Sequence, residues 1–262
     1  MKERADLILT RRGLAETRQK AQALIMAGLV FSGEQRVEKP GQMLDADSDL
    51  VLHGRMAFVS RGGMKLQEAL AHFRIDPSGR AAADLGSSTG GFTDCLIQNG
   101  AARVYAVDVD TRQIDWRLRK DPRVVLIQKN ARYLEKADFP EAIDIVTMDL
   151  AFISVLKVLP AVGFFAPRAS VLALVKPQFE ADRRKVGKRG VIRSPEVHEE
   201  VLNRVLAEAV GSGFMAEGVF KPSVRGQKGN QEFFVLWTRD GDSNSQDRFK
   251  TFIKEAVWDE KD

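Results

Sequence analysis

Four charged residues have the types and positions needed for proton chemistry at one edge of a sheet. Asp149 and Lys176 end predicted strands, Glu232 begins one, and Lys65 opens a predicted helix. Charged side chains at the carboxyl ends of parallel strands face the edge where open sheets bind ligands, and Glu232 would reach this edge from an antiparallel strand. Lysines and carboxylates at this edge could orient a hydroxyl group and take its proton.

A structural ion pair is the alternative role for two of these residues. Lys176 follows the apolar Leu174 and Val175, and a lysine buried beside them is costly without a partner. A salt bridge to Asp149 would provide that partner. The residues alone leave both roles open.

A glycine-rich segment, Asp84–Phe92, follows a predicted strand and opens a helix that runs to Asn99 and stops at Gly100. Its glycines at 86, 90 and 91 would let the backbone turn sharply and pass close to a ligand. The segment is neither G-x-G-x-x-G nor a phosphate loop ending in Gly-Lys-Ser/Thr. Dinucleotide and triphosphate ligands are therefore disfavoured.

Two polar residues follow the next two predicted strands. Asp108 could accept hydrogen bonds from both hydroxyls of a ribose, which suits either a dinucleotide or S-adenosylmethionine. Asn130 could both donate to and accept from the edge of an adenine. A turn residue that binds its own backbone is an equally good interpretation of Asn130.

The elements that must position these residues alternate between short apolar strands and helices from about residue 80 to 238, as an open parallel sheet requires. A terminal helix over 248–258 is predicted from Phe249, Phe252 and Ile253 at helical spacing. We predict seven strands: Ala81–Leu85, Val104–Asp108, Val124–Ile127, Ile143–Asp149, Val171–Lys176, Val219–Lys221 and Phe233–Thr238.

The first fifty-odd residues predict a small α+β unit. Helices are expected around Ala5–Arg12 and over Arg18–Ala27, the second with Thr17 as its N-cap and Gly28 as its stop. Short strands are expected at Leu29–Ser32 and Asp49–Leu52. Four cations along these helices could face phosphates, although from charge alone a solvated helix face is the preferred explanation. They are Arg11, Arg12, Arg18 and Lys20.

Length and composition limit the classes of protein. The chain has 262 residues, 44% hydrophobic and 29% charged, which supports one large or two modest domains with a substantial core. Its net charge of +4 hints only weakly at an anionic partner. A single cysteine, Cys95, and three scattered histidines offer no disulfide and no metal-ligand spacing, so no metal is expected. We find neither a secretory signal nor an apolar run of membrane-spanning length, and we expect a soluble cytoplasmic protein.

The charge is concentrated beside one candidate catalytic residue. From Lys176 to Arg193 there are seven cations and two acids, a local net charge of +5. This exceeds the net charge of +4 of the whole chain. Such a stretch suits contacts to the phosphates of a large RNA, and a solvated loop is the alternative. Phe152 and Phe179 could stack on a base, although phenylalanines near strand ends more often lie in a core.

The amino-terminal pattern resembles the S4 RNA-binding module. The resemblance covers about residues 3–52 and rests on Arg4-x-Asp6 and on Thr17-Arg18-x-x-Ala21-x-x-Leu24-Ile25-x-x-Gly28-x-Val30. The usual Val-Asn-Gly turn is replaced by Phe31-Ser32-Gly33. The resemblance implies that the basic helical surface binds structured RNA.

The rest of the chain resembles FtsJ/RrmJ-like ribose 2′-O-methyltransferases, whose Lys-Asp-Lys-Glu tetrad would be Lys65, Asp149, Lys176 and Glu232. Together with the S4-like unit, the segments Ser60-Arg-Gly-Gly-x-Lys65 and Val175-Lys-Pro-Gln-Phe-Glu180 closely resemble the TlyA family, named as hemolysins and known as rRNA cytidine 2′-O-methyltransferases. This implies a Rossmann-like seven-stranded class I methyltransferase domain over 59–262 behind an S4 domain over 1–58. It also implies ribosomal RNA or ribosomal subunits as partner, with no stable membrane association.

The resemblance also implies a cofactor, S-adenosylmethionine, and a role for each site residue. Lys176, held by Asp149, would be the base or orienting group nearest the 2′ oxygen, while Lys65 and Glu232 would fix the ribose. Cofactor binding falls to Asp84, Gly86, Ser87, Thr89, Gly90, Gly91, Phe92, Asp108, Asn130 and Asp149. RNA binding falls to Arg4, Arg11, Arg12, Arg18, Lys20, Arg61, Arg183, Arg184, Lys185, Lys188, Arg189 and Arg225.

Two other functions compete with this prediction. One is a membrane-lytic protein, as the hemolysin name suggests, which would need a membrane-inserting segment. The other is an RNA-binding ribosome assembly factor with an inactive methyltransferase domain.

Overall fold

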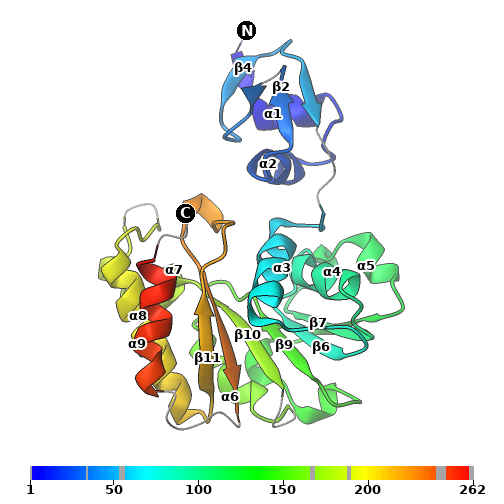
Figure 1. Cartoon of the computed structure of the whole chain (residues 1–262). Coiled ribbons are helices and arrows are strands. Elements are labelled where there is room, and N and C mark those ends of the chain that lie inside the picture. The colour runs from blue at the N-terminus through cyan, green and yellow to red at the C-terminus, as the bar shows by residue number, and fades with distance from the viewer. Residues whose placement is uncertain are drawn as a thin grey trace. The chain divides into compact units, whose positions relative to one another are not determined.

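The computed structural model describes residues 2–33, 35–52, 57–165, 169–187, 190–239 and 246–259. These residues form two compact units, 1–61 and 62–262, which we describe separately (Figure 1).

The amino-terminal unit packs two helices against short strands. Helices α1 (Ala5–Arg11) and α2 (Arg18–Met26) confirm the predicted pair, and Thr17 accepts a hydrogen bond from the Lys20 amide as the N-cap of α2. Five strands make two small antiparallel sheets, in the orders β1-β4 and β3-β2-β5. They are β1 (Lys2–Arg4), β2 (Val30–Ser32), β3 (Gln35–Arg36), β4 (Met43–Asp45) and β5 (Leu50–Leu52).

Its core is small and continuous. Ile8 and Leu9 of α1 meet Leu24 and Ile25 of α2, and Val30 closes the cluster from β2. Strands β1, β3 and β4 were not predicted, because strands of two or three residues are too short to show an alternating pattern.

The second unit is built on a seven-stranded sheet of order β11-β12-β10-β9-β6-β7-β8. The strands from β10 to β8 are parallel neighbours, and β12 lies antiparallel between β10 and β11. The bounds are β6 (Ala81–Leu85), β7 (Arg103–Asp108), β8 (Val124–Gln128), β9 (Ile145–Met148), β10 (Ser170–Val175), β11 (Met215–Phe220) and β12 (Phe233–Thr238). The predicted α/β fold and its seven strands are confirmed, and β11 begins earlier than predicted, with an irregular register between Ala216 and Gly218.

Helices accompany the sheet along the chain. The longer helices include α3 (Arg61–Phe73), α4 (Gly91–Gln98), α8 (Pro195–Gly211) and α9 (Gln246–Val257), and α9 confirms the predicted terminal helix. The short ones include α5 (Trp116–Lys120), α6 (Leu159–Val162) and α7 (Pro177–Glu180). Single 3₁₀ turns lie at η1 (Thr111–Gln113), η2 (Ala131–Tyr133), η3 (Lys136–Asp138), η4 (Val155–Lys157), η5 (Arg183–Lys185) and η6 (Gln227–Gly229).

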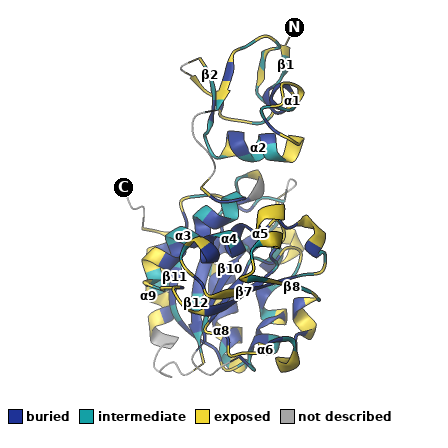
Figure 2. Ribbon diagram, turned by 90° about the vertical axis from the view of Figure 1, so that its right-hand side faces the viewer, coloured by how far each residue is buried: buried dark blue, intermediate teal, exposed yellow. Residues whose placement is uncertain are grey.

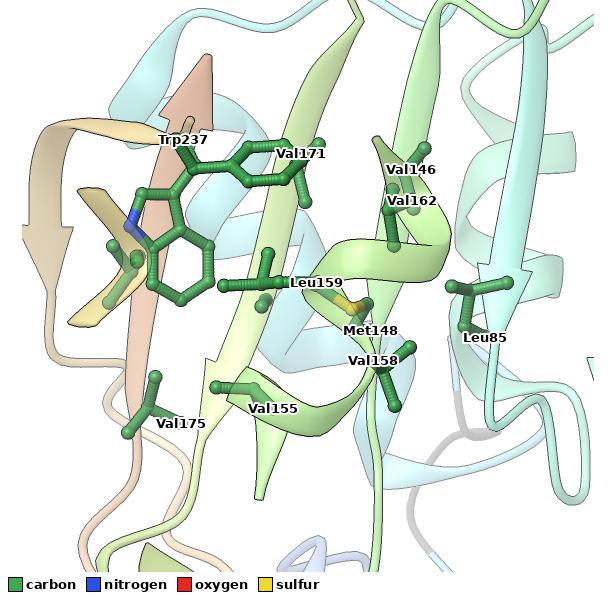
Figure 3. Packing of buried hydrophobic residues seen from close by; sticks show 14 of the residues in the cluster. Leu85, Val146, Met148, Val155, Val158, Leu159, Val162, Val171, Val175 and Trp237 are labelled. Carbon is green, nitrogen blue, oxygen red and sulfur yellow. The ribbon is translucent and has the colours of Figure 1, made fainter. Parts of the chain in front are cut away.

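The side chains of the strands divide between two faces of this sheet. On one face Val155, Leu159 and Val162 pack on Met148 and Val171 (Figure 3), and the same cluster includes buried residues of α8 and α9. Figure 2 shows the central strands as the most deeply buried part of the unit. The alternate residues of the strands face the other way, where Phe92 of α4 stacks on Phe234 of β12.

Candidate active site

The first of two lysine–carboxylate pairs joins α3 to the start of β12. Lys65 Nζ lies 2.5 Å from Glu232 Oε2, and the two side chains are only 9% and 3% exposed. Buried ions of opposite charge hold each other in place because neither can be solvated by water instead.

The second pair joins the ends of two parallel strands. Lys176 Nζ, just after β10, lies 2.5 Å from Asp149 Oδ1, just after β9. The distance is that of an ion pair, although the angles at Asp149 Oδ1 are not those of a hydrogen bond. These side chains are 13% and 27% exposed, so this pair has more access to water than the first.

Sheet register brings the residues of the two pairs to one edge. Val175 pairs with Phe233 across the antiparallel β10–β12 ladder, so the next residues outward, Lys176 and Glu232, lie opposite each other. Asp149 follows β9, the parallel neighbour of β10. The four residues predicted from sequence therefore gather at the same edge of the sheet.

Gly226 gives the Glu232 carboxylate its room. A Cβ on Gly226 would lie 2.0 Å from Glu232 Oε1, a distance that no side chain could accept. The loop between β11 and β12 therefore closes directly over this carboxylate.

The glycine-rich segment after β6 meets the same edge. Gly86 has φ +85°, and a Cβ there would lie 2.7 Å from the backbone oxygen of Asp149. Gly90 has φ +94°, and a Cβ there would lie 2.4 Å from Leu118 Cδ1. At both positions only glycine combines the left-handed backbone with the close approach.

Asp84 supports this segment from inside the protein. Its side chain is completely buried, and its two carboxyl oxygens accept hydrogen bonds from the Thr93 and Thr147 hydroxyl groups at 2.7 and 3.0 Å. Burial, with a smaller contribution from the nearby Asp149, raises the pKa of Asp84 to about 7 against the lowering effect of the two hydroxyl groups. The predicted cofactor residue Asp84 thus holds the segment in place.

Two further residues of the predicted cofactor set differ in environment. Ser87 is buried, and its hydroxyl oxygen has no hydrogen-bond partner within the described residues. Such a group is expected to meet a ligand or an ordered water molecule. Phe92 instead lies in the core, 3% exposed, with its ring centroid 5.8 Å from that of Phe234.

The two polar strand-end residues lie at the end of β7 and just after β8. Asp108 is half-buried and accepts hydrogen bonds from the Ser88 and Asp110 amides at 2.9 and 3.0 Å. A carboxylate can accept about four hydrogen bonds, so capacity remains for ribose hydroxyls. Asn130 is exposed and its side-chain oxygen accepts from the Arg132 amide at 3.0 Å, the turn role anticipated as the alternative. Its side-chain NH₂ group is the part that could face an adenine.

The arginines of the first unit already bind partners in their own fold. Arg4 and Arg18 both bind Asp6, whose side chain is fully buried. Burial would raise the pKa of Asp6, but hydrogen bonds from Arg4, Gln22 and Arg18 outweigh it and hold the pKa well below its usual range. Arg11 and Arg12 bind backbone oxygens near Ala46 and remain exposed.

The predicted cations of the second unit lie mainly between α7 and α8. Arg184 binds Asp182 and Lys185 binds Glu200, while Arg183 is exposed. Arg225 is exposed in the loop that carries Glu232, and Arg61 begins α3. Lys188 and Arg189 lie outside the described residues.

An exposed aromatic side chain stands beside the second ion pair. Phe152 is 89% exposed, has φ +64°, and its ring centroid lies 5.1 Å from that of Phe179. The Phe179 centroid is 6.0 Å from Lys176 Nζ. Phe152 is therefore not a core residue, and a strained, exposed ring at a candidate site suggests a ligand contact.

Several supporting residues escaped the sequence analysis. The Glu180 side chain is buried and accepts from the Val155 amide at 2.8 Å, which ties the segment after Lys176 to the segment after Asp149. Thr93 and Thr147 bind Asp84, and Asn230 joins two loops. Thr93 and Asn230 stand close in sequence to the glycine segment and to Glu232, but nothing in the sequence shows which backbone groups such side chains meet.

The described residues hold neither a metal-ligand cluster nor a membrane-spanning helix. Within the described ranges, His, Cys, Asp and Glu side chains form no group of three or more that could hold a metal ion. No helix of the described chain is both long and apolar enough to cross a bilayer.

Comparison with known proteins finds two family matches and close relatives. The model of FtsJ-like methyltransferases matches residues 58–239, and that of the S4 domain matches residues 3–51. The chain is 44% identical over 251 residues to YqxC of Bacillus subtilis (strain 168), described as a candidate rRNA methyltransferase, across 94% of this chain and 89% of that protein. It is 42% identical to the 16S/23S rRNA (cytidine-2′-O)-methyltransferase TlyA of Mycobacterium tuberculosis (strain H37Rv), across 90% of this chain and 89% of that protein. The solved structure of a candidate hemolysin from Streptococcus thermophilus superposes with a TM-score of 0.75 at 42% identity, covering 97% of this chain and 95% of that one.

Proposed function

Because the chain belongs to the TlyA family of FtsJ-like methyltransferases and carries an S4 domain, we propose that it methylates the ribose 2′-hydroxyl of cytidine in ribosomal RNA. The methyl donor in this proposal is S-adenosylmethionine. We assign residues 1–58 to an RNA-binding domain and residues 59–262 to a domain that transfers the methyl group and adds further RNA contacts. A ribosomal substrate would place the protein in the cytoplasm.

The residues around the glycine-rich segment fit this cofactor. Gly86 and Gly90 let the segment follow its left-handed path close against Asp149 and Leu118, which fixes it at the sheet edge. The Ser87 hydroxyl, which has no hydrogen-bond partner within the described residues, could bind the polar end of the cofactor. Asp108 would accept the ribose hydroxyls, with the Asn130 NH₂ group near the adenine. Asp84 and Phe92 would act indirectly. They would hold the glycine-rich segment and the helix α4 that follows it in place.

The observation that carries the proposal is the pair of lysine–carboxylate contacts at one edge of the sheet. S-adenosylmethionine, when bound, supplies an electrophilic methyl group. A ribose hydroxyl must lose its proton, or have its developing negative charge stabilised, before its oxygen can attack. Lys176, the more exposed lysine, would orient the 2′-hydroxyl, while Asp149 fixes the lysine. As a neutral amine Lys176 would take the hydroxyl proton, and as an ammonium it would stabilise the negative charge that develops on the oxygen.

The more deeply buried pair would have a positioning role. Lys65 and Glu232 are tightly enclosed, which suits a rigid wall against the ribose. Phe152 would stack on the exposed base of the target nucleotide, as aromatic side chains do in single-stranded RNA recognition.

RNA docking would use both units. Arg11, Arg12 and Lys20 would meet phosphates from the S4 side, and the cations around Arg183 would do so beside the active site. Arg4 and Arg18 each use a guanidinium edge on Asp6, so their contribution to RNA binding would come from their remaining donors.

The test is to incubate the protein with labelled S-adenosylmethionine and ribosomal subunits and to map the methylated riboses. Label on cytidine 2′-oxygens supports the proposal, and label on a base overturns it. Cofactor binding without transfer would favour the ribosome assembly factor. Liposome leakage caused by a Lys176→Ala variant would instead favour the membrane-lytic alternative.

A further inference from the structure

One buried side chain joins two loops of the second unit. The basic loop is the described residues 181–187 and 190–194 between α7 and α8, and the Glu232 loop is residues 221–232, between β11 and β12. Asn230, in the second loop, is 3% exposed. Its side chain reaches across to the basic loop.

Both ends of the Asn230 amide bind the backbone of the basic loop. Its Nδ2 donates to the Gly190 carbonyl oxygen at 2.9 Å, and its Oδ1 accepts from the Ile192 amide at 3.1 Å. A buried side-chain amide that satisfies two backbone groups at once fixes both distance and orientation. The basic loop is therefore attached at two points, one on each side of Val191.

The backbone of Asn230 continues the connection toward the ion pair. Its carbonyl oxygen accepts from the Gly226 amide at 2.9 Å, and Gly226 is the residue on which the Glu232 carboxylate rests. Glu232 follows Asn230 by two residues and holds Lys65. One asparagine thus connects the cation-rich segment to the pair that would fix the ribose.

A second contact attaches the basic loop to α8. His198 of α8 is 6% exposed, and its Nε2 lies 3.3 Å from the Ile192 carbonyl oxygen. Ile192 is itself buried. The loop is therefore anchored to α8 through Ile192, and Asn230 is its link to the Glu232 loop.

We propose that Asn230 is a positioning residue that makes the basic loop and the Glu232 loop move as one body, so that RNA contacts on the first set the Lys65–Glu232 pair held by the second. The inference rests on the proposed function for its substrate. Asn230 itself touches neither the RNA nor the cofactor in this assignment.

The first arm of the test needs no RNA and measures backbone hydrogen exchange. In an Asn230→Ala variant, amides of both loops should exchange at least about tenfold faster, because two anchoring bonds are lost. An Asn203→Ala variant removes an exposed asparagine of α8 that binds only its own helix, at Glu199, and should leave both loops unchanged. Faster exchange in the Glu232 loop alone, or in neither loop, would overturn the link.

The second arm measures methyl transfer to ribosomal subunits. Asn230→Ala should lower kcat by about 10- to 100-fold, with the dissociation constant for S-adenosylmethionine within about twofold of wild type. Asn230→Asp keeps the acceptor for Ile192 but sets a carboxylate oxygen against the Gly190 oxygen, so it should also lose activity. An equal loss of cofactor binding, or an unchanged kcat, would reject the positioning role.

A double variant separates coupling from general damage. Gly226→Ala displaces the Glu232 carboxylate, and Asn230→Ala should disturb the same group. The double variant should therefore slow methyl transfer less than the product of the two single effects. Fully multiplicative effects would show that the two residues act independently. If the wild-type protein transfers no methyl group to RNA, the proposed function fails, while the exchange measurements still decide whether the loops are linked.

Discussion

The S4 unit and the catalytic unit both bury carboxylates but surround them with different groups. In the S4 unit, Asp6 binds Arg4, Arg18 and Gln22. At the sheet edge each carboxylate pairs with a lysine, and beneath it Asp84 accepts hydrogen bonds from two hydroxyl groups and from the backbone of Thr93, with no cation of the described residues bound to it. An arginine in a protein keeps its proton, whereas a lysine can give one up. The first arrangement suits fixed structure, and the second suits proton chemistry.

The largest effect should come from replacing a lysine at the sheet edge. Lys176→Ala should lower methyl transfer by about 10²–10⁴-fold, because the 2′-hydroxyl loses its orienting group and proton acceptor. Calorimetry should show S-adenosylmethionine binding within about twofold of wild type. Lys254→Ala, on the surface of α9, is the control.

Lys176→Arg tests the comparison itself. It keeps the positive charge beside Asp149 but cannot give up a proton, so it should be almost as inactive as Lys176→Ala. If the arginine variant kept most of the activity, charge alone would suffice, and the contrast between the two units would not hold.

The next effect concerns the S4 hub. Asp6→Ala removes the shared partner of two arginines and should cost the unit about 2–3 kcal/mol, less than a fully buried pair because Arg4 and Arg18 are partly exposed. Hydrogen exchange in α1 and α2 should accelerate, while cofactor binding by the other unit stays unchanged. Unaltered exchange in α1 and α2 would mean that the hub contributes nothing to holding the unit together.

A smaller effect should follow from crowding the Glu232 carboxylate. Gly226→Ala places a Cβ where the carboxylate lies and should reduce kcat about tenfold by displacing the partner of Lys65. Gly211→Ala is the matched control, since a Cβ there has no atom within 4 Å. Equal activity of both variants would show that the Lys65–Glu232 pair tolerates displacement.

The smallest effect is a difference in pH response between the units. The pKa of Asp6 is lowered by folding, so its contribution is present above about pH 4 and is lost as the pH falls below it. The pKa of Asp84 is raised to about 7, so the folded unit holds an extra proton between about pH 4 and 7 and loses stability as the pH rises through that window. Acid should therefore weaken the S4 unit, and neutral to alkaline pH the catalytic unit.

Asp84→Asn sharpens this point, since an amide cannot ionise. It should remove the pH dependence that Asp84 causes and raise the stability of the catalytic unit by about 1–2 kcal/mol at pH 8. The measurement is the thermal unfolding transition of the catalytic unit, followed separately from that of the S4 unit. The Thr93 and Thr147 hydroxyl groups can rotate to bind the amide. A variant that is less stable than wild type at pH 8 would show that the two hydroxyl groups need a carboxylate.

Much of the fold could be predicted from local patterns. The strand Ala81–Leu85 and the cap Thr17 follow from apolar runs and capping chemistry, and the structure has both. The gathering of Lys176 and Glu232 followed from placing them at strand ends. Their place opposite each other at the end of one ladder, in contrast, depends on the position of β12 between β10 and β11, which no local pattern encodes.

Supporting contacts between distant segments were beyond prediction for the same reason. The contact of Gly226 with Glu232 depends on how the loop between β11 and β12 folds back, which no local pattern shows. Asn230 and Glu180 are polar residues of ordinary type, and their roles depend on which backbone amides face them. The arginines near Asp6 were predicted as RNA contacts, because sequence shows their charge but not their partner.

The central position of β12 also has a consequence for how the protein is made. Lys65 is paired with a residue 167 positions later in the chain, carried at the start of a strand that must insert between β10 and β11. A chain still emerging from the ribosome can complete its S4 unit early, since that unit's contacts are local. Lys65 stays without its carboxylate partner until β12 has been synthesised. Under the proposed function, the unit assigned to RNA docking would therefore be complete before the candidate active site is assembled.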